Sequence, residues 1–152
     1  TIHRLGVDGQ GRLDLDEYAA LLSDDVALVS VMWANNETGT IFPVEIMAKM
    51  AKEKGILFHT DAVQAVGKLA ISLKDTSIDM LSFSGHKIHG PKGVGALYVR
   101  RGTRFRPLLR GGHVPLAQNK TADTALVFAF GCRFLNGFLG GISHAKTLIL
   151  IK

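Results

Sequence analysis

The 152-residue chain is predicted to form an α/β domain around a mostly parallel β-sheet. Segments that alternate like strands and segments with the period of helices follow one another along the chain. The run at residues 26–33 (VALVSVMW) is almost continuously apolar and rich in β-branched residues, which is typical of a strand covered on both faces. Hydrophobic residues make up 47% of the sequence, enough to fill the core of one domain of this length.

The N-terminal part begins with strand-like sequence and then predicts an amphipathic helix at residues 13–22. The segment GVDGQGRLDLDE runs from the end of the first strand-like stretch into this predicted helix. It superficially matches a calcium loop, with Gly11 and Glu17 at the sixth and twelfth loop positions. The first ligand position, however, holds Gly6 rather than aspartate, and no helix fits before it. We therefore interpret it as a strand end, a glycine turn and the acidic start of a helix.

The middle of the chain continues the alternation. A polar loop at residues 34–40 (ANNETGT) precedes a predicted helix at residues 43–54, which begins with a proline and is ended by Gly55. Further strands are predicted at residues 56–59, 78–83 and 95–100.

The character of the sequence changes after residue 113, where apolar runs are interleaved with glycines. We expect a helix at residues 121–130 within this part. The chain is accordingly divided into a domain at residues 1–113 and a divergent tail at residues 114–152.

Composition argues against several classes of function. The net charge of +5 comes from scattered basic residues, apart from a patch at residues 92–110, so no nucleic-acid partner is expected. No run of eighteen apolar residues is present, so no membrane partner is expected either. A single cysteine, Cys132, suits a reducing compartment and a cytoplasmic location. The chain starts at Thr1 rather than at methionine, which suggests a piece of a longer protein.

Three predicted strands are followed by polar residues with little structural reason to be there. The first strand is followed by Asn36, the second by Asp61 and Gln64, and the third by residues 84–87. The groups are separated by about one helix-plus-strand unit each, so they are expected at one edge of the sheet. In parallel α/β sheets this carboxyl edge is where ligands bind.

A lysine and a carboxylate at such an edge are the pair that pyridoxal phosphate (PLP) chemistry requires. The lysine forms a Schiff base after it loses its proton, and the carboxylate keeps the pyridine nitrogen protonated. We therefore expect Lys87 to be the Schiff-base lysine and Asp61 to be the partner of the ring nitrogen.

The remaining polar residues extend this hypothesis. Asn36 and Gln64 are expected to act as amide donors to the phenolic oxygen of the ring, whereas Ser84 and His86 would reach the phosphate. Taken singly, Lys87 is also compatible with an ordinary solvated loop lysine. No metal site is expected, because the histidines lack metal-ligand spacing.

The segments NNETGTIFPV, HTDAVQAVGK and SFSGHKIHGPKGVGALYVRRG, in this order, resemble cysteine desulfurases of the class V aminotransferase group. Within that group the chain resembles the type that serves nitrogenase and iron–sulfur cluster assembly. The resemblance covers residues 1–113. It implies that the chain is a fragment of the large domain of a PLP-dependent transferase with the aspartate aminotransferase-like fold.

The resemblance also implies an activity and partners. The family removes sulfur from L-cysteine, leaving L-alanine and a persulfide on an enzyme cysteine, and it acts as a homodimer that supplies an iron–sulfur scaffold protein. It implies a catalytic set of Lys87, His86 and Asp61, with Lys87 acting as base at the substrate α-carbon. His59 would orient Asp61 or pack nearby.

Parts of the family pattern are absent from this sequence. The phosphate loop and a ring-stacking residue would lie before Thr1, and the catalytic cysteine would lie beyond Lys152. Cys132 is too near Lys87 to take that role. We therefore expect an incomplete, catalytically deficient fragment. The alternatives are a non-catalytic remnant that at most binds or dimerises, and another class V enzyme such as a selenocysteine lyase or an aminotransferase.

Overall fold

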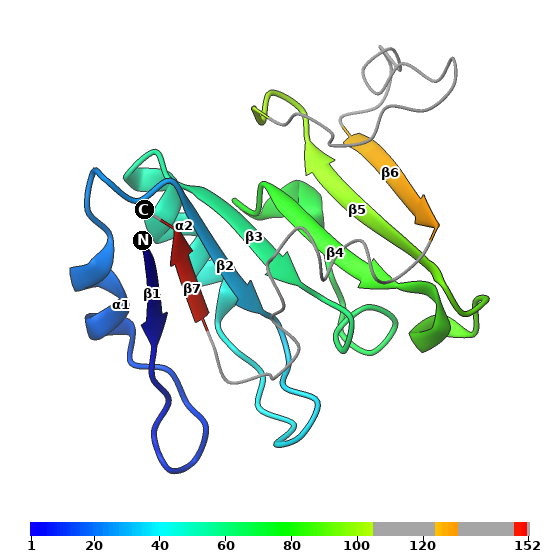
Figure 1. The fold of residues 1–152 in the computed structure, drawn as a ribbon, viewed down its shortest axis with the longest axis horizontal. Coiled ribbons are helices and arrows are strands. Elements are labelled where there is room, and N and C mark those ends of the chain that lie inside the picture. Colours follow the sequence, from blue (N-terminus) through cyan, green and yellow to red (C-terminus); the bar gives the residue numbers. More distant parts are fainter. Residues whose placement is uncertain (105–123, 131–147, 152) are drawn as a thin grey trace.

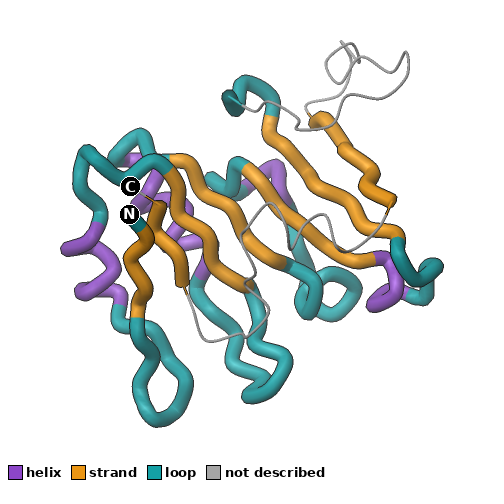
Figure 2. Tube along the Cα trace, viewed as in Figure 1, coloured by secondary structure: helices purple, strands orange, loops and turns teal. Residues whose placement is uncertain are grey.

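The computed structural model describes residues 1–104, 124–130 and 148–151. These residues form a seven-stranded sheet with the order β1-β7-β2-β3-β4-β5-β6 (Figures 1 and 2). The strands are β1 (Ile2–Leu5), β2 (Leu28–Met32), β3 (Leu57–Asp61), β4 (Met80–Ser84), β5 (Val94–Arg100), β6 (Thr124–Phe130) and β7 (Leu148–Ile151). The helices are α1 (Leu15–Leu21) and α2 (Val44–Glu53), with short 3₁₀ turns η1 (Leu73–Asp75) and η2 (Gly85–Ile88).

The centre of the sheet is parallel. Strands β2, β3 and β4 pair in parallel, whereas β7 pairs antiparallel with both β1 and β2, and β5 pairs antiparallel with both β4 and β6. The α/β class with a parallel core and flanking helices is confirmed. The predicted elements of residues 1–104 begin and end within about two residues of the observed ones, which is the usual uncertainty of element ends.

Local hydrogen bonds explain where α1 begins and how it contacts α2. Asp14 is the N-cap of α1, because its Oδ1 accepts hydrogen bonds from the amides of Asp16 (2.8 Å) and Glu17 (3.2 Å). Tyr18 is the buried residue of α1, and its hydroxyl donates to the Met47 carbonyl of α2 at 2.9 Å. This bond connects the two helices through the core.

One face of the three central strands is mainly apolar, whereas the other, here called the polar face, carries most of their polar side chains together with residues such as Met32 and Met80. Residues in register on parallel strands share a face, and successive residues alternate between faces. The apolar face packs with α2 and carries Val29, Val31, Phe58, Thr60 and Leu81. The polar face carries Ser30, His59, Asp61, Ser82 and Ser84. Because residues 29–31 are all buried, β2 is covered on both faces, as predicted.

The helix predicted at residues 121–130 is wrong. Residues 124–130 form strand β6, which pairs along its whole length with β5, from Val94 opposite Phe130 to Arg100 opposite Thr124. The edge of β5 would otherwise present unpaired amides and carbonyls, and pairing them outweighs a weak local helix preference. Residues 121–123 lie outside the described part.

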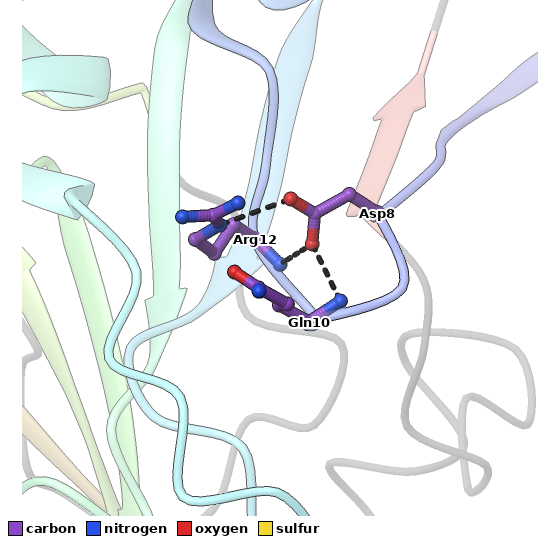
Figure 3. A network of polar contacts seen from close by, with 3 residues as sticks. All are labelled: Asp8, Gln10 and Arg12. Carbon is purple, nitrogen blue, oxygen red and sulfur yellow. Dashed lines mark hydrogen bonds and ion pairs between the residues drawn. The ribbon is translucent and has the colours of Figure 1, made fainter.

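The glycine-rich segment after β1 is a self-contained turn (Figure 3). Oδ1 of Asp8 accepts hydrogen bonds from the amides of Gln10 and Arg12, each at 2.9 Å, and Oδ2 pairs with Nε of Arg12 at 2.9 Å. Gly11 has a φ of 75°, which favours glycine. The backbone hydrogen bond from Arg12 lowers the pKa of Asp8. The carboxylate therefore serves the turn itself.

Two kinds of feature are absent from the described residues. No group of three or more histidine, cysteine, aspartate or glutamate side chains in them is arranged to hold a metal ion. None of the helices in the same part of the chain combines the length and apolarity needed to cross a membrane.

Arg100 anchors the segment between η1 and β4. Its guanidinium donates to the carbonyls of Ile78 (2.8 Å), Leu73 (2.7 Å) and Thr76 (2.9 Å). Its amide donates to the carbonyl of Asp79, whose carboxylate in turn accepts from the amide of Phe58 on β3. The start of β4 is thereby held against β3 by side-chain as well as backbone hydrogen bonds.

Thr60 places a hydroxyl group on the apolar face, and its effect on stability can be tested. Its hydroxyl is fully buried and has no hydrogen-bond partner among the described residues. Thr60→Val keeps the shape and removes the unsatisfied group, so the free energy of unfolding in urea should rise by about 1 kcal/mol. Thr76→Val is the matched control, because that hydroxyl donates to the Leu73 carbonyl and accepts from the Ile78 amide, and it should destabilise the chain. Equal destabilisation by both variants would contradict the assignment.

Candidate functional site

The carboxyl ends of β2, β3 and β4 meet at one edge of the sheet. Met32, Asp61 and Ser82 are in register across the three strands. Beyond them, the amide of Trp33 donates to the Asp61 carbonyl and the amide of Ala62 donates to the Ser82 carbonyl, each at 2.8 Å. In Figure 1 the arrowheads of the three strands point to the same side, and Figure 2 shows loops following β2 and β3 there, whereas β4 runs directly into η2.

Asp61 is the last residue of β3 and lies at the centre of this edge. Its Oδ1 accepts a hydrogen bond from the amide of Val63 at 2.9 Å. Burial raises the pKa of Asp61, and the Val63 hydrogen bond opposes this shift only in part. No cationic side chain in the described ranges pairs with the carboxylate. A partly buried carboxylate without a counter-charge favours a cationic ligand group.

Lys87 lies in η2, directly after β4. The turn is closed by the Gly85 carbonyl, which accepts from the amides of His89 and Gly90. A Cβ on Gly90 would come within 2.9 Å of that carbonyl oxygen, so the close approach requires glycine. The side chain of Lys87 is exposed and makes no hydrogen bond or ion pair with the described residues. Its backbone is therefore fixed while its amine is available.

Ser84 and His86 form a pair beside Lys87. Ser84 is buried at the end of β4, and its Oγ lies 2.7 Å from Nδ1 of the exposed His86. This contact orients the imidazole ring across the start of η2. A hydroxyl and an imidazole in this position are suitable donors for an anionic group.

Asn36 and Gln64 lie on the loops that follow β2 and β3. Asn36 is exposed, and Gln64 is half-buried. The side-chain oxygen of Gln64 accepts a hydrogen bond from Nζ of Lys68 at 3.2 Å, which leaves the amide nitrogen of Gln64 as its donor toward a ligand. Both amides thus flank the edge on which Asp61 lies.

Asn35 is a contributor that the sequence analysis did not single out. Its Oδ1 accepts from the amides of Glu37 (2.8 Å) and Thr38 (3.1 Å), and its backbone bonds with Thr40 and Gly39. This Asx-type turn sets the course of the loop that carries Asn36. The signal was present in the sequence, because an asparagine before a short polar stretch that ends in glycine is typical of such turns.

The structure brings the predicted residues to one edge but joins only some of them. Ser84 contacts His86, whereas Lys87 and Asp61 are not connected by any hydrogen bond among the described residues. Two hollows, of about 470 and 680 Å³, lie instead beside the turn of Figure 3, and neither includes Asp61 or Lys87. The candidate residues are thus identified by their chemical types and by their common edge of the sheet.

The chain matches a known protein family and several known proteins. The family model described as aminotransferase class-V matches residues 1–140. The chain is 73% identical over 113 residues to "Cysteine desulfurase NifS" of Azotobacter vinelandii, an alignment that covers 74% of this chain and 28% of that protein.

Two solved structures are also similar. The chain matches a "NifS-like protein" with a TM-score of 0.67 and 49% identity, over 71% of this chain and 30% of that one. It matches "SspA in complex with cysteine" with a TM-score of 0.66 and 41% identity, over 70% and 31% of the two chains. The chain spans less than a third of the length of these relatives. It belongs to the aminotransferase class-V family and is similar, over most of its own length, to cysteine desulfurases.

Proposed function

We propose that this chain is the PLP-binding part of a cysteine desulfurase. The observation that carries the proposal is the placement of Asp61, a carboxylate without a counter-charge among the described residues, and the exposed amine of Lys87 at the ends of adjacent parallel strands. Membership of a family that uses this cofactor, and similarity to a relative solved "in complex with cysteine", support it.

The donor set fits PLP group by group. Lys87 supplies the amine for covalent attachment, and Asp61 supplies the negative charge that a pyridinium nitrogen requires. Asn36 and Gln64 would donate to the ring oxygen. Ser84 and His86 would donate to the phosphate, which suits their position beside a short turn at the strand end.

The proposed chemistry acts on the α-carbon of L-cysteine. When bound, PLP supplies an electron sink for that carbon. Lys87 Nζ would take and return the proton there, Asp61 would keep the ring nitrogen charged, and His86, oriented by Ser84, would lie beside the amine. These three side chains form the proposed catalytic set.

Further parts of the proposal concern the whole protein. L-alanine would be released, and the sulfur would be left as a persulfide on a cysteine that Cys132 does not match in position. The intact protein would act as a cytoplasmic homodimer that delivers sulfur to an iron–sulfur scaffold protein. The division into residues 1–113 and a tail at residues 114–152 also remains a proposal.

Attachment of PLP is the direct test of the proposal. After PLP is added to the purified chain and reduced with borohydride, mass spectrometry should place the pyridoxyl group on Lys87. Lys87→Ala should lose this adduct. Lys92→Ala is the matched control, because Lys92 is an exposed lysine on the next turn and its removal should change nothing. Equal labelling of the unsubstituted chain and Lys87→Ala would contradict the proposal.

Asp61→Asn should have opposite effects on stability and on binding. Because burial raises the pKa of Asp61 above its value in the unfolded chain, the folded chain loses stability as pH rises from about 4 through the folded pKa. The variant lacks this loss, so the unliganded chain should melt at a higher temperature than the unsubstituted one at pH 7. Its PLP affinity should fall by at least about tenfold, because the ring nitrogen loses its counter-charge. An unchanged affinity would exclude the assigned role.

Turnover should be low for this chain alone. We expect little or no alanine from L-cysteine, because the only cysteine in the sequence, Cys132, does not match the nucleophile of the family. Alanine can be measured by chromatography with and without an added thiol acceptor. Rapid release without the thiol, abolished by Cys132→Ser, would overturn the expectation of deficiency. Preference for selenocysteine would favour a lyase instead.

A further inference from the structure

A buried hydrogen-bonded trio joins the three central strands of the sheet. Nδ1 of His59 on β3 lies 2.8 Å from the hydroxyl of Ser30 on β2, and Nε2 lies 3.2 Å from the hydroxyl of Ser82 on β4. The exposed fractions of Ser30, His59 and Ser82 are only 8%, 5% and 4%. One imidazole ring therefore connects β2 to β4 across β3.

The ring is neutral at physiological pH. Burial lowers the pKa of His59 to about 4. A neutral imidazole has one N–H donor and one acceptor nitrogen, so one serine accepts from it and the other donates to it. Both ring nitrogens are thereby satisfied, and no charge is placed near Asp61.

The trio lies directly behind the candidate site. His59 precedes Asp61 by two residues and shares its face of the sheet. Ser82 is in register with Asp61, and it precedes Ser84 by two residues. Ser30 lies two residues before Met32, which is the register partner of Asp61 on β2. The trio therefore lies beside the edge from which the site loops leave.

Packing alone does not require polar groups here. Apolar side chains of similar size would fill the layer without the free-energy cost of burying hydroxyls and an imidazole. Hydrogen bonds differ from apolar contacts because they fix distance and direction. A satisfied polar network is accordingly suited to holding the supports of a binding site in a defined position.

We propose that His59 is a positioning residue that sets the separation of the ends of β2, β3 and β4. Because these strand ends carry the site loops, His59 also sets the separation of Asn36, Asp61 and Lys87. The role of these three residues rests on the function proposed above. His59 does not touch the cofactor in this proposal. It acts by holding the strands that carry the residues which do.

The experiment removes one bond of the trio at a time in the full chain. Ser30→Ala removes the bond to β2, and Ser82→Ala removes the bond to β4. In His59→Asn the side-chain amide takes the position of Nδ1, so the bond to Ser30 is kept and the bond to Ser82 is lost. In His59→Gln the amide takes the position of Nε2, so the bond to Ser82 is kept and the bond to Ser30 is lost. Thr60→Val is the matched control, because Thr60 is buried on the same strand but faces α2.

Two measurements report the effect. Amide hydrogen exchange of Trp33 reports the β2–β3 end, and that of Ala62 reports the β3–β4 end, because these amides bond across the strands there. The amide of Met47 in α2 is the reference. Ser30→Ala should accelerate exchange at Trp33, and Ser82→Ala at Ala62, each about tenfold, as expected for one buried neutral hydrogen bond, with Met47 unchanged.

The second measurement is the dissociation constant of PLP from absorbance titration. Each serine variant should weaken PLP binding about tenfold. His59→Asn should weaken it as much as Ser82→Ala, and His59→Gln as much as Ser30→Ala, because each pair loses the same hydrogen bond. Thr60→Val should bind PLP as the unsubstituted chain does. Uniformly faster exchange with unchanged PLP affinity would mean simple packing and would overturn the proposal. So would unchanged exchange at Trp33 and Ala62. If the unsubstituted chain takes up no PLP, the proposed function fails, and the exchange pattern still decides whether His59 sets the strand spacing.

Discussion

The parallel register of β2, β3 and β4 is the constraint on which the candidate site depends. Met32, Asp61 and Ser82 lie side by side because parallel strands with this register end at the same level. A slip of one residue in β3 would turn Asp61 toward α2 and place Thr60 on the polar face. The backbone hydrogen bonds of the sheet therefore determine which side chains meet, before any side chain contacts another.

The two faces of these strands divide stability from chemistry. The apolar face packs with α2 and contributes Val29, Val31, Phe58 and Leu81 to the hydrophobic core. The polar face contains Asp61, whose carboxyl has a raised pKa, and the trio around His59. Burying this face therefore costs free energy of folding. That a strand such as β3 carries Phe58 and Thr60 on one side and His59 and Asp61 on the other is a direct result of its two-residue period.

Much of this arrangement was predictable from the sequence, because periodicity and strand ends are local signals. The strand and helix positions in residues 1–104 and the common edge of Asn36, Asp61 and Lys87 followed from them. The partners of His59 were not predictable, since two serines from neighbouring strands meet it only through the register. Strand β6 was missed for a similar reason, because its conformation depends on pairing with β5 rather than on its own preferences.

Strand β7 has a consequence for how the chain folds. Residues 148–151 lie between β1 and β2, so that the earliest strand of the sequence gains its partner from the latest (Figure 1). Such a contact has a very high sequence separation. The entropy of closing the loop between the two strands is lost before their hydrogen bonds and contacts can offset it. During synthesis β1 can pair with β7 only after residue 151 has emerged, whereas β2, β3 and β4 can associate much earlier. The site-bearing strands are therefore expected to form the folding nucleus, and the outer edge at β1 is expected to join last.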